Sequence, residues 1–186
     1  RSPSVSLIVT APRTVTVDAR TGDGSITADD LAGTITLNSG DGSIRTRRIE
    51  GTLRARTGDG SIAISDAAGR VEADSGDGSI ELGGRFEAID VRTGDGSVRL
   101  DVVDGSVLKG DWSVSTGDGS ITVRLPRNLD AELDAHTGDG GVHADGIPGN
   151  VEKTDNDDRG SLKAQIGKGG RTLRLRSGDG SINISR

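Results

Sequence analysis

Apolar and polar residues alternate along most of the chain in short runs with a period of two. In TITLNSGDGSIRTRRIEG, residues 34–51, Ile35 and Leu37 alternate with polar residues before a Gly-Asp-Gly turn. Ile44 and Thr46 alternate in the same way after that turn. A period of two is typical of a strand with one buried face. The unit therefore predicts two short strands joined by a tight corner.

The same unit recurs along the whole chain. Its Gly-Asp-Gly turn occurs eight times, and steps of 18, 18, 18, 18, 23, 21 and 40 residues separate the aspartates. A degraded copy, KTDNDDRGSLKA at residues 153–164, lies inside the last step, which gives nine units. Self-similarity at a fixed period indicates a repeat architecture, in which each unit buries its apolar face against its neighbours. The eight turn aspartates are Asp23, Asp41, Asp59, Asp77, Asp95, Asp118, Asp139 and Asp179.

The constant step predicts an all-β fold, a single-stranded parallel β-solenoid (β-helix) of about nine coils. Each coil is an 18-residue repeat with two short strands. Equivalent residues of stacked coils lie about 4.8 Å apart, so one extra residue would break every ladder. An antiparallel meander of hairpins stays possible, but it gives no reason for a constant length. A triangular solenoid of six-residue rungs would need an apolar residue where Asp41 stands.

The alternation also predicts which side chains face the interior. A further inward position lies near the second corner of each unit, where a glycine or Asp-Gly follows. The predicted strand positions are Ile35, Leu37, Ser39, Ile44, Thr46, Leu53, Ala55, Thr57, Ile62, Ile64, Val71, Ala73, Ser75, Ile80, Leu82, Ile89, Val91, Thr93, Val98 and Leu100. The predicted second-corner positions are Leu31, Ile49, Ala67 and Val103.

We expect one β-solenoid domain over residues 1–186. Residues 1–14 form an N-terminal cap or first strand, residues 15–125 regular coils, and residues 126–186 irregular coils with the degenerate repeat near 153–164. The N-terminal SPSVSLIVTAPRTVTV, interrupted by Pro3 and Pro12, is suited to cover the first rung.

The C-terminus stops on a full-strength repeat, SGDGSINISR. An uncovered rung exposes unpaired N–H and C=O groups that can template another chain. We therefore expect the N–H of Asn183 to face an open edge through which copies associate end to end, unless Arg186 blunts that short strand.

The repeated turn has a physical explanation. Glycine permits either a positive φ or a close approach of neighbouring coils. The preceding Ser or Thr points inward, where its hydroxyl can bond buried corner backbone. The aspartate is expected to cap its own turn by accepting the N–H two residues on. On the outer faces, Arg54 should lie beside Glu72, and Arg56 beside Asp74.

Composition excludes several function classes. The formal net charge is −6 and no basic cluster is present, so we expect no nucleic-acid partner. Only 31% of residues are hydrophobic and 1% aromatic, which predicts a thin aliphatic core. There is no cysteine, and no apolar run is long enough to span a bilayer, so we expect no membrane contact within this chain. The chain begins at Arg1, so any signal or anchor would lie outside it.

No residues stand out as catalytic, cofactor-binding or metal-binding. His136 and His143 flank one turn without a second ligand cluster, so we interpret both as surface residues. The turn serines have no visible base beside them. Trp112 and Phe86 are expected to fill the core.

Aspartates stacked in neighbouring coils would repel each other by about 1 kcal/mol per pair in water. A bound cation would offset this repulsion, so a calcium-binding β-roll stays an alternative. The run Asp155 to Asp158 lacks calcium-loop spacing and reads as a solvated loop.

The iterated TGDGSI and SGDGSI corners, the LAG, IEG and AAG corners between them, and the ending IGKGGRTLRLRSGDGSINI resemble the bacterial adhesin family of unknown function with β-strand repeats. The resemblance covers nearly the whole chain and implies a β-solenoid in an extracellular or cell-envelope location. It supplies no catalytic residues. We therefore expect a non-enzymatic structural or adhesive module. The alternative is an extracellular ligand- or polymer-binding solenoid, including an enzymatic or calcium-binding one.

Overall fold

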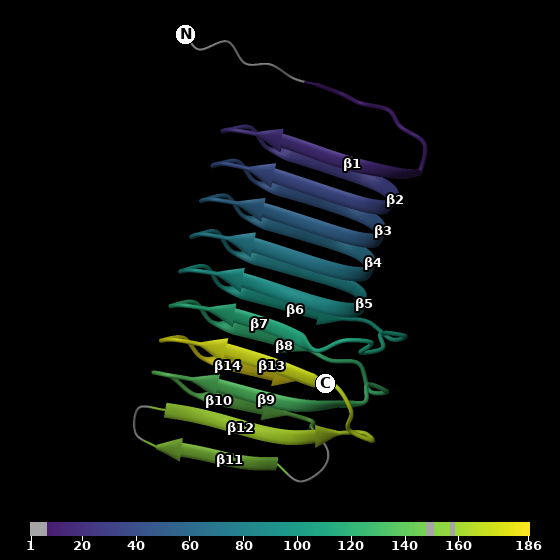
Figure 1. Ribbon diagram of the computed structural model, residues 1–186. Helices are drawn as coiled ribbons and strands as arrows, with labels where there is room; N and C mark the ends of the chain where they lie inside the picture. Colours follow the sequence, from purple (N-terminus) through teal and green to yellow (C-terminus); the bar gives the residue numbers. More distant parts are fainter. Residues whose placement is uncertain (1–6, 148–150, 157–158) are drawn as a thin grey trace.

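The computed structural model describes residues 7–147, 151–156 and 159–186, and these contain strands and turns but no helix. Most strands lie in parallel ladders and build one unclosed sheet that folds back on itself (Figure 1). The strands are β1 (Thr14–Thr21), β2 (Ile26–Ser39), β3 (Ile44–Thr57), β4 (Ile62–Ser75), β5 (Ile80–Thr93), β6 (Val98–Val102), β7 (Trp112–Thr116), β8 (Ile121–Arg124), β9 (Ala131–Thr137), β10 (Val142–Asp145), β11 (Val151–Asn156), β12 (Arg159–Ile166), β13 (Thr172–Ser177) and β14 (Ile182–Ser185).

The first five strands stack in a constant parallel register. Thr14 of β1 lies beside Ala32 of β2, and Ile44 of β3 lies beside Ile62 of β4, so each residue pairs with the residue eighteen positions further on. This register excludes the antiparallel meander for this part of the chain. It breaks only between β4 and β5, where the second corner carries two register shifts.

Two layers enclose the core. The first layer contains the strand segments that lead into each Gly-Asp-Gly corner, and the second contains those that follow it. Strands β2 to β5 contribute to both layers because each bends at the second corner. Further along, separate strands take the two roles: β7, β13 and β9 continue the first layer, and β6, β8, β14 and β10 the second.

The C-terminal repeat does not end the stack. Strand β13 lies between β7 and β9, and β14 lies between β8 and β10, all in parallel register. Figure 1 shows this yellow segment inside the green part of the stack. The prediction of an open C-terminal rung is therefore wrong, because Asn183 has a strand partner on each side, Thr122 and His143. The long step before this repeat returns the chain to a slot between the rung of β7 and β8 and the rung of β9 and β10.

The predicted degenerate coil at residues 153–164 is instead an antiparallel hairpin. Strand β12 pairs antiparallel with β9, and β11 pairs antiparallel with β12. This segment lacks the Gly-Asp-Gly corner that turns the other repeats into the second layer, so it extends the first layer alone. Asp157 and Asp158 of the predicted solvated loop lie outside the described residues.

The N-terminal segment also departs from its prediction as a cover. Residues 7–13 lie in no strand and are exposed, and the first ladder begins at Thr14. Pro3 lies outside the described residues, whereas Pro12 lies in the exposed segment just before β1. The described part of this segment leaves the first rung uncovered.

The core follows the predicted alternation. All twenty predicted strand positions are buried, from Ile35 to Leu100. At the second corner Ile49 and Ala67 are also buried, but Leu31 is half-buried because it lies in the terminal rung. The inward prediction for Val103 is wrong: its side chain is 47% exposed, because the chain leaves the ladder after Val102 and enters a longer loop.

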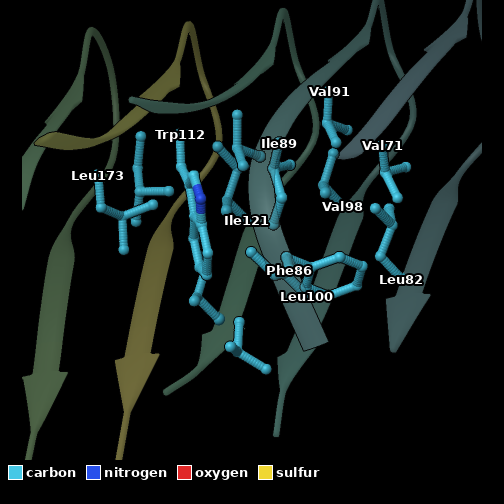
Figure 2. Packing of buried hydrophobic residues seen from close by; sticks show 14 of the residues in the cluster. Val71, Leu82, Phe86, Ile89, Val91, Val98, Leu100, Trp112, Ile121 and Leu173 are labelled. Atoms are coloured by element: carbon cyan, nitrogen blue, oxygen red, sulfur yellow. The ribbon is translucent and has the colours of Figure 1, made fainter. Parts of the chain in front are cut away.

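The two large aromatic residues fill the widest part of the core, as predicted. Phe86 and Trp112 are fully buried and meet edge to face, with ring centroids 6.3 Å apart. Figure 2 shows Trp112 between the layers with Leu173 of the inserted repeat on one side. The indole Nε1 is buried and has no hydrogen-bond partner in the described part of the chain.

Close backbone contact holds the Gly-Asp-Gly corners together. The Gly76 N–H donates to the carbonyl of Gly58 at 2.6 Å, and the next rungs repeat this bond. The Ser75 hydroxyl donates to the Gly60 carbonyl at 2.9 Å and accepts the Gly78 N–H at 3.1 Å. The predicted inward hydroxyl column is thus confirmed. Close approach, rather than a positive φ, explains the glycines of this corner, since only Gly140 among them has a positive φ.

Charged pairs form on the outer face as predicted. Arg54 Nε lies 3.0 Å from Glu72 Oε2, and Arg56 Nε lies 3.6 Å from Asp74 Oδ2. Partial burial of Glu72 opposes its ionisation, but the hydrogen bonds and charges of Arg56 and Arg54 outweigh that cost and lower its pKa. These exposed pairs contribute little stability, yet they disfavour slipped registers.

One buried hydroxyl gives a stability prediction. Thr46 Oγ1 is buried without a partner among the described residues, whereas Thr57 Oγ1 donates to the Gly42 carbonyl at 2.9 Å. Removing an unsatisfied hydroxyl relieves a desolvation cost, whereas removing a satisfied one orphans a buried carbonyl. We expect Thr46→Val to stabilise the fold by about 1 kcal/mol and the matched Thr57→Val to destabilise it by about 1–2 kcal/mol. Urea unfolding of both variants measures this, and equal effects would contradict it.

The close rung contact gives a second prediction. A Cβ on Gly60 would overlap the carbonyl oxygen of Gly42, so the backbone would have to shift. We expect Gly60→Val to lower stability by about 1–3 kcal/mol, as overpacking does. The Asp59→Asn control changes only an exposed side chain and should stay within about 0.5 kcal/mol of the parent. Thermal melts compare the two, and similar losses would show that the corner does not depend on rung contact.

Candidate functional site

The eight aspartates of the Gly-Asp-Gly corners form an exposed row along one edge of the stack. The predicted capping role is wrong: we find no hydrogen bond to these carboxylates among the described residues. The Ser or Thr hydroxyl before the turn accepts the N–H of the second turn glycine, as at Gly42, Gly78 and Gly180. No group of three metal-ligating side chains occurs in the part of the chain that the structure describes. The row is therefore a solvated charged edge.

The two histidines do not form a site together. His136 lies on β9 between Ser161 and Arg176 of the neighbouring strands and is half-buried. His143 lies on β10 in the other layer and is exposed. Neither belongs to a metal-ligating group within the described ranges.

The second corner carries backbone strain. Asp30, Arg48 and Asp66 have φ values of 56°, 52° and 53°, a region that residues with a Cβ rarely adopt. They occupy the same place in three successive rungs. Gly33, Gly51 and Gly69 follow them with φ values of 112–120°, and together these residues turn the chain from one layer to the other.

Ion pairs tie the strained corner together. Arg13 contacts Asp30 at 3.3 Å and Glu50 at 2.9 Å, which joins two rungs. Asp29 accepts contacts from Arg47 at 2.9 Å and Arg48 at 2.8 Å. The hydrogen bond from Arg47 lowers the pKa of Asp29, and the charges of both arginines add to that effect. The carboxylate therefore stays ionised under ordinary conditions.

A long loop stands beside this corner. Residues 103–111 connect β6 to β7, and the 23-residue step of the sequence pattern is the signal of this enlarged connection. The hydroxyl of buried Ser106 accepts the Phe86 N–H at 3.1 Å and donates to the Val103 carbonyl at 2.9 Å. Lys109 pairs with Glu87 at 2.6 Å. These bonds fix the loop and leave Val107 59% exposed.

Several open cavities border the loop, and we call the combined surface of two of them the second-corner groove. One has a volume of about 680 Å³ and is lined by residues that include Arg70, Val107 and Lys109. The other has a volume of about 620 Å³ and is lined by residues that include Arg85 and Val103. The cavities share Arg85, Glu50 and Ala68, so they are contiguous.

The second-corner groove combines unpaired charge with exposed apolar surface. Arg70 and Arg85 are exposed and have no ion pair among the described residues, and the same holds for the carboxylates of Asp66 and Asp104. Other charges of the groove are paired, Glu50 with Arg13 and Glu87 with Lys109. Val103 and Val107 add exposed apolar surface next to them. Reasoning from sequence did not identify Arg70, Arg85 and Val107. In the structure these residues bring unpaired charge and exposed apolar surface to one groove.

The strained corner gives a third prediction. Asp66→Gly and Asp66→Ala both remove the carboxylate, but only alanine keeps a Cβ at a φ of 53°. A Cβ in the left-handed region costs about 1–2 kcal/mol, partly offset by the greater freedom of glycine in the unfolded chain. We expect the glycine variant to be the more stable of the two by about 1 kcal/mol. Chemical denaturation of the pair tests this, and a more stable alanine variant would argue against strain at this position.

Comparison with known proteins adds one finding. Toastrack DUF4097, a repeat-like family, matches residues 2–185. Neither a search of curated proteins nor one of solved structures finds a match. Among the described residues we find no apolar helix of membrane-spanning length. Because the family match spans nearly the whole chain and agrees with the stack of parallel strands, the protein belongs to the Toastrack DUF4097 family, whose function is unknown.

Proposed function

We propose that this chain is a non-enzymatic β-solenoid, built on the 18-residue repeat, that serves as a structural or adhesive module in the bacterial cell envelope or outside the cell. The observation that carries this proposal is the continuous stack of rungs, in which one corner repeats the same buried hydroxyl and backbone bonds along its length. Such a stack is a rigid scaffold whose stability comes from nearest-neighbour contacts. The envelope location rests on the adhesin-like repeats.

The second-corner groove supports the adhesive form of the proposal. Binding residues commonly lie on loops that a rigid scaffold positions. Here the loop at residues 103–111 places Val107 beside Arg70, and Arg85 lies in both cavities. Two unpaired arginines next to exposed valines suit an extended polymer that carries negative charge and some apolar surface.

Isolated bacterial cell walls provide the test. Fluorescently labelled protein is co-sedimented with the walls, and we compare it with the Arg70→Glu/Arg85→Glu variant. The matched control, Arg45→Glu/Arg99→Glu, reverses two exposed arginines on the second layer, away from the groove. We expect the groove variant to bind at least about tenfold more weakly, since each lost charge-assisted contact costs about 1.5–3 kcal/mol, and the control to bind like the parent.

Two results would argue against the proposal. Sedimentation no greater than that of serum albumin would remove the adhesive role. Release of soluble fragments from the walls would replace the non-enzymatic role with the enzymatic alternative. Equal losses in both double variants would instead place binding outside the second-corner groove.

A further inference from the structure

The N-terminal end of the stack has two open strand edges. Strand β1 stands first in the strand order and pairs only with β2 among the described residues. The second-layer part of β2, residues 26–31, pairs only with β3. Each edge therefore presents backbone N–H and C=O groups without a strand partner, and such edges template the addition of another strand.

The core is also open at this end. Val17, Ala19 and Ile26 are half-buried. The residues one rung further in, Ile35 and Ile44, are fully buried. The inward side chains of β1 thus lack the neighbouring rung that covers every interior position, and they form an apolar strip between the two open edges.

Nothing in β1 blunts this edge. Strand β1 contains no proline and no inward charge, since its two charged residues, Asp18 and Arg20, alternate with the half-buried positions. The other end of the stack differs, because the antiparallel hairpin of β11 and β12 extends it beyond the last Gly-Asp-Gly rung. The two ends are therefore not equivalent.

We propose that the N-terminal end binds the same end of a second copy of this chain. A two-fold axis perpendicular to the layers sets the two β1 strands antiparallel and continues the first layer across the contact. The same axis sets residues 26–31 of each copy against their equivalents in the second layer. Such an isologous contact closes as a dimer and does not propagate into a filament.

Charge complementarity selects a second copy as the occupant. Residues directly opposite each other in an antiparallel pair point to the same face of the sheet. The axis must therefore pass at a residue of β1 and not between two residues. With the axis at Ala19, Asp18 of each copy lies opposite Arg20 of the other, and Val17 lies opposite Thr21 on the inner face. An axis at Asp18 would place the two carboxylates against each other. Within one copy Arg20 lies 3.0 Å from Asp18, so both side chains lie on the same, outer face of β1 next to the edge where the second copy would pair.

The chain's own leading segment is the competing occupant. Leu7, Ile8 and Val9 are 83%, 89% and 74% exposed, and Ile8 precedes Ile26 by one 18-residue period. In that register the segment would cover residues 26–31 but not β1. The structure shows residues 7–13 outside any strand and the edge of β2 unoccupied by them.

Charge reversal in the full chain tests the proposal. Sedimentation velocity over a hundredfold concentration range should show a monomer–dimer equilibrium for the parent. Arg20→Asp and Asp18→Arg, each alone, place like charges opposite each other twice and should weaken the dimer at least about tenfold. An equimolar mixture of the two variants restores both opposite pairs and should dimerise like the parent. The matched control is Arg92→Asp, which breaks the equivalent Arg92–Asp90 pair on an interior rung and should leave dimerisation unchanged.

A second measurement fixes the register. The chain has no native cysteine, so Ala19→Cys should form a disulfide-linked dimer under mild oxidation, whereas Val15→Cys should not. Monomer at every concentration would overturn the proposal. Hydrogen exchange would then identify the leading segment as the occupant if amides of residues 26–31 are protected. A dimer that Arg20→Asp and Arg92→Asp weaken equally, or a mixture that fails to recover, would also contradict it.

Discussion

The close contact between successive Gly-Asp-Gly corners is the constraint on which the rest of the structure depends. The glycine N–H of one rung reaches the glycine carbonyl of the next at 2.5–2.8 Å along the row. A side chain at either glycine would meet that carbonyl, so this corner accepts neither a larger residue nor a longer turn. The buried Ser or Thr hydroxyl then bonds the carbonyl that stacking would otherwise leave without a partner.

Because the first corner accepts no insertion, variation gathers at the second. Three longer connections lie on that side: the loop at residues 103–111, the connection from β8 to β9 and the turn between β12 and β13. The same side contains Asp30, Arg48 and Asp66, whose backbones adopt the left-handed conformation, and the second-corner groove. One edge of the stack is therefore regular, and the other is irregular and carries the second-corner groove.

The insertion of the last repeat shows that stacking contacts, rather than the order of the repeats along the chain, set the position of a rung. Strands β13 and β14 join the chain after the β11–β12 hairpin, yet they lie between rungs that precede that hairpin. Ser177 donates to the Gly119 carbonyl at 2.9 Å, and Thr137 donates to the Gly180 carbonyl at 2.7 Å. Any rung with this corner can pair with any other, because each one presents the same donors and acceptors. The inserted repeat thus has a strand partner on each side in both layers, whereas the outer strands of the described stack, β1 and β11, each pair on one side alone.

The sequence by itself determined the unit of the fold. Alternation around Ile35, Leu37 and Ile44 specified the buried face, since a strand places every second residue on one side. The repeated turn specified the parallel stack, because only equal steps keep each hydroxyl opposite the next corner. The outer pair of Arg54 and Glu72 followed from the same register.

Only the tertiary structure decided the position of each unit in the stack and the hydrogen-bond partners of the corner backbone. The position of the last repeat depends on the antiparallel hairpin of β11 and β12 that precedes it. The period of the sequence does not distinguish this hairpin from a degenerate coil at residues 153–164. The exposure of Val103 and the second-corner groove depend on how the loop folds over Phe86. The corner carboxylates make no hydrogen bond among the described residues, whereas the hydroxyl of Ser75 accepts the N–H of Gly78 three residues later. Local pattern records which face of a strand is buried, whereas pairing between distant strands is set by the whole folded chain.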